Sequence, residues 1–233
     1  MEYNTPMQFS IPSFRPIVNS IKERFSQPQR PFTYVALGDS TVQGIGASHP
    51  SRSTAGIIFA TILANKKNAL YHNLGVDGAR ISEVRRNQLE QAIAMQPDLI
   101  TISVGANDIR FRTGLASFRS ELTWLLEKLR AETDATIVIT TIPDLSLTPR
   151  VPFLVKGITN LMVKRLNSVI TDLAKEHKII CIDMYHQSRV YAAHYPELIA
   201  SDGFHPSDLG YALWANTIIS QISHILFPNR FSL

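Results

Sequence analysis

The sequence predicts an α/β protein built on a five-stranded parallel sheet with helices on both faces. Three observations predict it. Short apolar segments alternate with longer amphipathic ones from residue 32 onward. The short segments show no polar alternation, which favours strands buried on both faces. Helical segments separate the strands one by one, an order typical of parallel sheets that are covered on both sides.

Ten elements are expected in this order. The strands are predicted at Tyr34–Leu37, Ala69–Tyr71, Leu99–Val104, Thr136–Thr141 and Lys178–Ile182. The helices are predicted from a cap at Ser53 or Thr54 through Leu63, then at Ile81–Met95, Leu115–Leu129, Phe153–Ala174 and Pro206–Ile225. Pro206 is expected at a first helical position, where its missing N–H costs little.

Composition limits the classes of protein to consider. The 233 residues are 45% hydrophobic and 18% charged, which excludes wholesale disorder, collagen and coiled coil. The one cysteine, Cys181, excludes an intramolecular disulfide and is expected in the core. No apolar run reaches the ~18 residues of a membrane-spanning helix, and the N-terminus lacks the pattern of a secretory signal. A cytoplasmic location is therefore expected.

Residues 1–31 are expected to form an N-terminal arm ahead of a single domain over residues 32–233. Apolar residues recur there at helical spacing between basic ones, namely Phe14, Ile17, Val18, Ile21 and Phe25. A short amphipathic helix of this kind packs on its own domain or lies on a membrane surface, and both readings stay open. The net charge of +4 is small and gives no support for nucleic-acid binding. The oligomeric state is not readable.

Three clusters of polar residues directly follow predicted strands, and a fourth lies beyond the fifth strand. The clusters are Gly38-Asp39-Ser40, Asn73 through Gly78, Gly105-Ala106-Asn107-Asp108 and Asp202-Gly203-Phe204-His205-Pro206. Ligands of parallel sheets bind at the carboxyl ends of the strands. These clusters are therefore the predicted functional site.

The residue types at this site are those of acyl transfer. Ser40 is the candidate nucleophile, and a serine hydroxyl needs a base to remove its proton. His205 is the candidate base, because imidazole exchanges protons near neutral pH. Asp202, three residues earlier, is placed to accept a hydrogen bond from the other ring nitrogen and to hold the tautomer.

A tetrahedral intermediate also needs donors for its negative oxygen. The candidates are the Ser40 N–H, the N–H of a glycine after the second strand and the side-chain amide of Asn107. One such donor typically stabilises the transition state by about 2.7–4 kcal/mol. Asp39 and Asp108 are expected to shape the loops by accepting hydrogen bonds from nearby backbone N–H groups.

These blocks resemble the SGNH (GDSL-type) hydrolases. Gly38-Asp39-Ser40 is similar to the family's first block, and Asp202-x-x-His205 to its last. Spacing from Asn73 in the second block points to Gly78 as the oxyanion-hole glycine, and Asn107 matches the third block. The resemblance implies a flavodoxin-like three-layer fold and cofactor-free hydrolysis of esters, as in esterases and lipases. Two departures are Ala106, where glycine is usual, and Thr41-Val42-Gln43-Gly44 after the serine.

The chain lacks the motifs of other hydrolytic, nucleotide-binding and metal-dependent mechanisms. There is no Gly-x-Ser-x-Gly, no phosphate-binding Gly-x-x-x-x-Gly-Lys-Ser/Thr and no histidine spacing for a metal site, so neither metal nor cofactor is expected. Three alternatives stay open: a carbohydrate O-deacetylase, an acyltransferase on the same site, and a non-catalytic flavodoxin-like binding module. A binding module usually loses part of the triad, and this chain keeps all three residues.

The substrate is expected to be a small-molecule or lipid ester, and loops at the strand ends should select it. The stretch from residue 143 through Val155 either lines an acyl groove or only covers the core. Tyrosines between residues 184 and 201 either border the substrate or pack inside. Arg110 and Arg112 follow Asn107 closely, and at least one of them is expected at the rim of the cleft, favouring anionic substrates.

Overall fold

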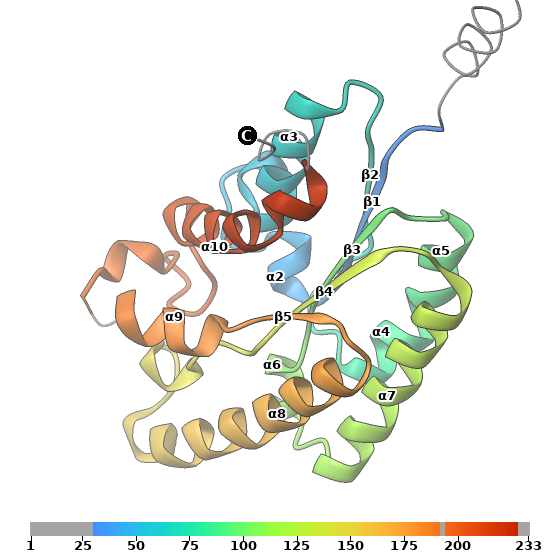
Figure 1. Cartoon of the computed structure of the whole chain (residues 1–233). Coiled ribbons are helices and arrows are strands. Elements are labelled where there is room, and N and C mark those ends of the chain that lie inside the picture. Colours follow the sequence, from blue (N-terminus) through green and yellow to red (C-terminus); the bar gives the residue numbers. More distant parts are fainter. Residues whose placement is uncertain (1–29, 192–193, 228–233) are drawn as a thin grey trace, which may run out of the picture. The chain divides into compact units, whose positions relative to one another are not determined.

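The computed structural model describes residues 30–191 and 194–227 (Figure 1). Residues from Phe32 onward form one compact unit. The amphipathic helix expected in the arm lies outside the described residues. Among the described helices, none combines the length and the apolar character needed to cross a bilayer.

The sheet has five parallel strands, as predicted, each within two residues of its expected bounds. They are β1 (Thr33–Gly38), β2 (Leu70–Asn73), β3 (Leu99–Ser103), β4 (Thr136–Thr140) and β5 (Ile180–Ile182). Their order is β2-β1-β3-β4-β5. The winding direction reverses between β1 and β3, which is the place where doubly wound sheets bind their ligands.

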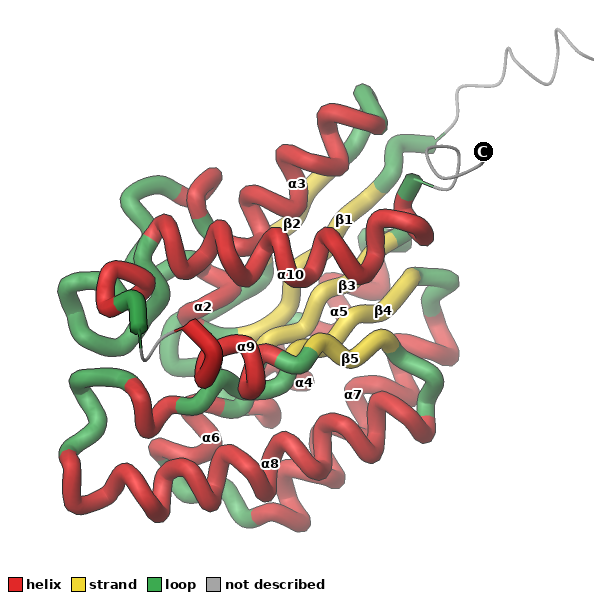
Figure 2. Tube along the Cα trace, turned by 60° about the vertical axis from the view of Figure 1, so that its left-hand side comes forward, coloured by secondary structure: helices red, strands yellow, loops and turns green. Residues whose placement is uncertain are grey.

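Helices cover both faces of the sheet (Figure 2). On one face lie α3 (Thr54–Asn65) and α10 (Asp208–Leu226), and on the other α4 (Ile81–Asn87), α5 (Leu89–Ala94), α7 (Leu115–Glu132) and α8 (Lys156–Glu176). The shorter elements are α2 (Ser40–Gln43), α6 (Ala106–Arg110), α9 (Met184–Tyr191) and the 3-10 turns η1 (Pro50–Arg52), η2 (Leu145–Leu147), η3 (Phe153–Val155) and η4 (Pro196–Leu198).

Two hydrophobic cores hold these layers together. Successive side chains of β1 point to opposite faces, so Tyr34 and Ala36 join the core under α3 and α10. Val35 and Leu37 join the core under α4, α7 and α8. All four are fully buried, which explains why the strand is apolar without alternation.

Three local expectations were wrong or incomplete. The helix predicted over residues 81–95 is interrupted at Gln88, between α4 and α5. Pro206 is not a helical residue, because an antiparallel bridge to Ile199 keeps it extended, and Ser207 caps α10 instead by accepting from the Gly210 N–H. Cys181 is only half-buried, although it packs against the core and burial raises the pKa of its thiol to about 11.

Candidate active site

The chain leaves β1 through a turn that only glycine can make. Gly38 has a φ of +149°, and a Cβ there would lie 1.9 Å from the Ser103 carbonyl oxygen. Asp39 follows as the N-cap of α2 and accepts hydrogen bonds from the Thr41 N–H at 3.0 Å and the Thr41 hydroxyl at 2.8 Å. Burial raises the pKa of Asp39 to about 6, although these two hydrogen bonds act to lower it. The turn places Ser40 at the first position of α2, with 4% of its surface exposed.

Ser40, His205 and Asp202 form one hydrogen-bonded chain, although 165 residues separate the first two. His205 Nε2 lies 2.9 Å from Ser40 Oγ, and His205 Nδ1 lies 2.5 Å from Asp202 Oδ2. The imidazole therefore bridges the hydroxyl and the carboxylate, an arrangement suited to carrying a proton from the serine.

The loop before α10 holds this histidine in place. The other oxygen of Asp202, Oδ1, accepts from the backbone N–H groups of Phe204 at 2.8 Å and His205 at 3.0 Å. Burial acts to raise the pKa of Asp202, but the hydrogen bonds from His205 and Phe204 outweigh it and hold that pKa below its usual value. The Phe204 ring meets the His205 ring edge-on, with centroids 5.1 Å apart. Asp202 thus stays anionic at neutral pH and orients the ring.

Three groups are predicted to donate hydrogen bonds to the oxyanion: the N–H groups of Ser40 and Gly78 and the side-chain amide of Asn107. Within the described residues, the N–H groups of Ser40 and Gly78 donate to no protein acceptor, and Gly78 has a φ of +77°. Asn107 lies in α6 and is 8% exposed. Its amide nitrogen donates to the Ala79 carbonyl at 3.3 Å, which leaves its second hydrogen available. Asp108 beside it is buried and accepts from the Ile81 N–H at 3.0 Å, and burial raises its pKa.

Gln88 supports the nucleophile turn, although no sequence motif pointed to it. Its side-chain amide accepts from the Gly38 N–H and donates to the Gly38 carbonyl, both at 2.8 Å. The side chain is 2% exposed. One signal was present, because a glutamine four residues after Val84 falls on the apolar stripe of a helix, where a buried polar group needs a partner.

The loop after α2 supports the histidine and was also missed. A Cβ at Gly46 would lie 2.9 Å from the His205 Cβ and 2.6 Å from the Pro206 carbonyl, and Gly46 has a φ of +94°. Tyr211 of α10 donates its hydroxyl proton to the Ile45 carbonyl at 2.6 Å. These contacts fix the loops of Ser40 and His205 against each other.

A cavity opens on the two reacting groups. It contains about 900 Å³ of space, part of it open to solvent, and Ser40 and His205 are among its lining residues. The rest of the lining is mostly apolar. It includes residues of η2, α9 and α10 and of the loop after β4, among them Ile142, Leu145, Leu147, Tyr191, Leu213 and Trp214.

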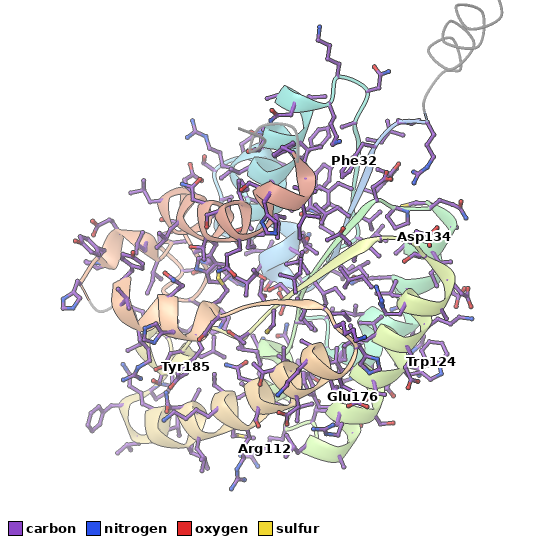
Figure 3. The ribbon with its side chains drawn as sticks, in the orientation of Figure 1. Phe32, Arg112, Trp124, Asp134, Glu176 and Tyr185 are labelled. Atoms are coloured by element: carbon purple, nitrogen blue, oxygen red, sulfur yellow. The ribbon has the colours of Figure 1, made fainter. Side chains whose placement is uncertain are left out.

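One part of the segment that precedes α8 lines the cavity, and another part is exposed on the surface. Residues 143–145, 147 and 148 line the cavity, but Phe153 and Leu154 do not and are 85% and 93% exposed. Of the three tyrosines between residues 184 and 201, which are Tyr185, Tyr191 and Tyr195, only Tyr191 lines this cavity. Tyr185 lies to the side, where its hydroxyl bonds to the Asn160 amide at 2.9 Å (Figure 3).

Arg110 and Arg112 are exposed and do not line the cavity. Arg110 ends α6, and Arg112 has a φ of +55°, which turns the chain outward. Figure 3 shows Arg112 at the lower edge of the molecule, pointing away from it. The geometry therefore gives no support for the expected role of these arginines at the rim.

Comparison with known proteins agrees with this geometry. Residues 36–213 match the model of the GDSL-like lipase/acylhydrolase family. An acetylxylan esterase of Geobacillus stearothermophilus is 26% identical over 156 residues, which are 64% of this chain and 70% of that protein.

Solved structures share the fold. A lipase/acylhydrolase from Enterococcus faecalis superposes with a TM-score of 0.68 at 24% identity, covering 83% of this chain and 96% of that one. A member of the lipolytic G-D-S-L family from Veillonella parvula gives a TM-score of 0.66 at 20% identity, covering 82% and 98%. Since the family model spans most of the chain, the protein belongs to the GDSL-like lipase/acylhydrolase family and is an ester hydrolase.

Proposed function

We propose that Ser40 is the nucleophile of this ester hydrolase and that the preferred acyl group is apolar and longer than acetyl. The observation that carries the proposal is the apolar cavity that opens on the Ser40–His205 pair. An acyl chain placed there buries its methylene groups, each stabilised by about 0.8 kcal/mol.

The first half-reaction forms an acyl-enzyme. Ser40 Oγ attacks the ester carbonyl carbon while His205 Nε2, 2.9 Å away, takes the hydroxyl proton. The carbon–oxygen bond to the alcohol then breaks, and the imidazolium returns the proton to the departing alkoxide. In the second half-reaction a water molecule attacks the acyl carbon, with His205 again as the base, and releases the acid and Ser40.

Asp202 and the donor groups lower the barrier of both steps. Asp202 keeps the proton of His205 on Nδ1, so that Nε2 presents its lone pair to Ser40, and it stabilises the imidazolium. The N–H groups of Ser40 and Gly78, with the amide of Asn107, are the donors for the oxyanion. They come from the segments that follow β1, β2 and β3, so the sheet rather than local sequence would preorganise them.

A second candidate is the removal of acetyl groups from a carbohydrate. The similarity to an acetylxylan esterase favours it, and Tyr191 and Trp214 in the cavity lining offer rings on which a sugar can stack. The same acyl-enzyme also serves an acyltransferase when an alcohol replaces water. The length of the acyl group separates the first two candidates.

Hydrolysis of p-nitrophenyl esters from acetate to palmitate by wild type and Ser40→Ala tests the proposal. We expect kcat/KM to rise from acetate to a longer chain and to fall by at least 1,000-fold for Ser40→Ala. Substitution by alanine of Ser120, an exposed residue of α7 that does not line the cavity, is the control and should leave the profile unchanged. An optimum at acetate supports the deacetylase, and turnover that survives Ser40→Ala contradicts the assignment of the nucleophile.

A further inference from the structure

The turn η3 and the start of α8 carry an exposed apolar surface that the catalytic proposal does not use. We call it the α8 patch; it consists of Phe153, Leu154, Val155, Ile158 and Leu161. Their exposed fractions run from 42% to 93%, with Leu154 the highest. Single exposed apolar residues are ordinary on a protein surface, but five within nine residues mark an interaction site.

The chain around the α8 patch is basic. Between residues 145 and 171 it contains Arg150, Lys156, Lys164 and Arg165 and no aspartate or glutamate. None of these four side chains forms an ion pair within the described part of the chain. The next acidic residue, Asp172, is paired with Arg119 at 3.3 Å. The segment thus adds four uncompensated positive charges next to the apolar side chains.

The α8 patch also adjoins the candidate active site. The last cavity-lining residue of its loop is Thr148, five residues before Phe153. Two residues on, the Arg150 N–H donates to the Gly203 carbonyl at 3.0 Å, inside the loop that carries Asp202 and His205. In Figure 2 the start of α8 lies at the same side of the domain as the carboxyl ends of the strands.

We propose that the α8 patch docks the protein on an anionic lipid surface. Apolar side chains that enter the acyl region, surrounded by lysine and arginine at the level of the head groups, are the arrangement that binds proteins peripherally to such membranes. A second copy of the chain fits the surface less well. A symmetric dimer through the patch would bring the same four positive charges of each copy together.

Docking in this orientation places the candidate active site beside the lipid surface. An ester with a long acyl chain is held in the membrane at much higher concentration than in water, and the apolar cavity would take it from there. This consequence rests on the proposed function, whereas the docking itself does not.

Binding of the full chain to vesicles tests the docking. The vesicles are pure phosphatidylcholine, or phosphatidylcholine with 30% phosphatidylglycerol, and bound protein is measured by co-sedimentation. We expect binding to the anionic vesicles only, weakened by salt. Leu154→Asp, and Lys164→Gln combined with Arg165→Gln, should each reduce the partition coefficient at least tenfold. Leu63→Asp is the control, because Leu63 is exposed on α3, away from the patch, and should bind as wild type does.

Four results would overturn the docking proposal: no binding, equal binding to both kinds of vesicle, unchanged binding of the patch variants, or a dimer in solution that Leu154→Asp dissociates without any effect of lipid. Ser40→Ala separates this proposal from the previous one. It should bind vesicles as wild type does, while Leu154→Asp should keep the wild-type rate on water-soluble p-nitrophenyl butyrate. Vesicle binding with full activity of Ser40→Ala would contradict the proposed nucleophile and leave the docking supported.

Discussion

Two carboxylates of the site differ in charge because of their surroundings. Asp39 is 2% exposed, and burial raises its pKa to about 6, although Thr41 donates two hydrogen bonds to it. Asp202 is more exposed, and bonds from His205 and Phe204 hold its pKa below the usual value in spite of partial burial. At pH 5 Asp202 is therefore ionised, while most of Asp39 is protonated. This difference fits Asp202 for orienting a histidine and Asp39 for capping α2.

The raised pKa of Asp39 predicts how stability depends on pH. Between pH 4 and 6 the unfolded chain has released the Asp39 proton and the folded protein still holds it, so the free energy of unfolding falls as pH rises and levels off above pH 6. From pH 4.5 to 7, wild type should lose about 2 kcal/mol more than Asp39→Asn. Urea unfolding at the two pH values measures this. The exposed Asp77→Asn is the control, and parallel behaviour of wild type and Asp39→Asn would contradict the prediction.

At the scale of elements, the loop between α2 and η1 supports the loop that carries His205. Gly46 packs against His205 and Pro206, and the Ile45 carbonyl accepts from Tyr211. Ser48 adds hydrogen bonds from its N–H and its hydroxyl to the Asp208 carboxylate, at 2.8 Å and 2.6 Å. The loop between α2 and η1 is thereby joined to the His205 loop at one point and to α10, which follows that loop, at two, and we expect these contacts to hold His205 over Ser40.

A methyl group at Gly46 should disturb the packing of this loop against the His205 loop. Its Cβ would lie 2.6 Å from the Pro206 carbonyl, so the histidine loop must move in Gly46→Ala. A displacement near 1 Å costs on the order of 100-fold in rate, and we expect kcat to fall by that amount with little change in KM. Gly157→Ala is the matched control, because a Cβ at this helical position meets nothing within 4 Å. Equal kcat for wild type and Gly46→Ala, with p-nitrophenyl butyrate as substrate, would refute a positioning role.

At the scale of the whole molecule, the doubly wound order of the sheet assembles the site. β1 and β3 are neighbours, and Gly38 pairs with Ser103 at their carboxyl ends. The turn that leads to Ser40 and the turn that leads to Asn107 therefore leave the sheet side by side, at the carboxyl ends of these two strands. The loop before α10 then brings His205 to Ser40, with 2.9 Å between Nε2 and Oγ. The cavity arises where η2, α9 and α10 meet above this edge.

The compactness of the domain predicts that the arm is dispensable for catalysis. Residues from Phe32 onward form one compact unit, and this unit contains Ser40, Asp202 and His205. A chain that begins at Arg30 should keep kcat/KM on p-nitrophenyl butyrate within twofold of the full chain, and its Tm within a few degrees. A loss of activity above tenfold in the shortened chain, with a folded circular dichroism spectrum, would show that the arm contributes to the site.

The sheet and the position of each polar block along the chain could be predicted from local sequence patterns. Both are local properties: the lack of alternation in β1 and β3 reports burial on both faces, and a residue that directly follows a strand must lie at the carboxyl edge. For this reason the places of Ser40 and Asn107 at that edge could be predicted, whereas Asp202 and His205 lie well beyond β5 and were recognised by their chemistry and by the Asp-x-x-His pattern.

The surroundings of the remaining side chains could not be predicted in this way, because they depend on how distant elements pack. The loop before α8 could not be divided from its sequence, yet Thr148 faces the cavity and Leu154 faces outward. Arg112 lies outside the cavity for the same reason, and Gln88 finds its partner, Gly38, fifty residues away. Such contacts depend on how distant elements pack, and local periodicity carries no information about a neighbour that the fold brings in from another part of the chain.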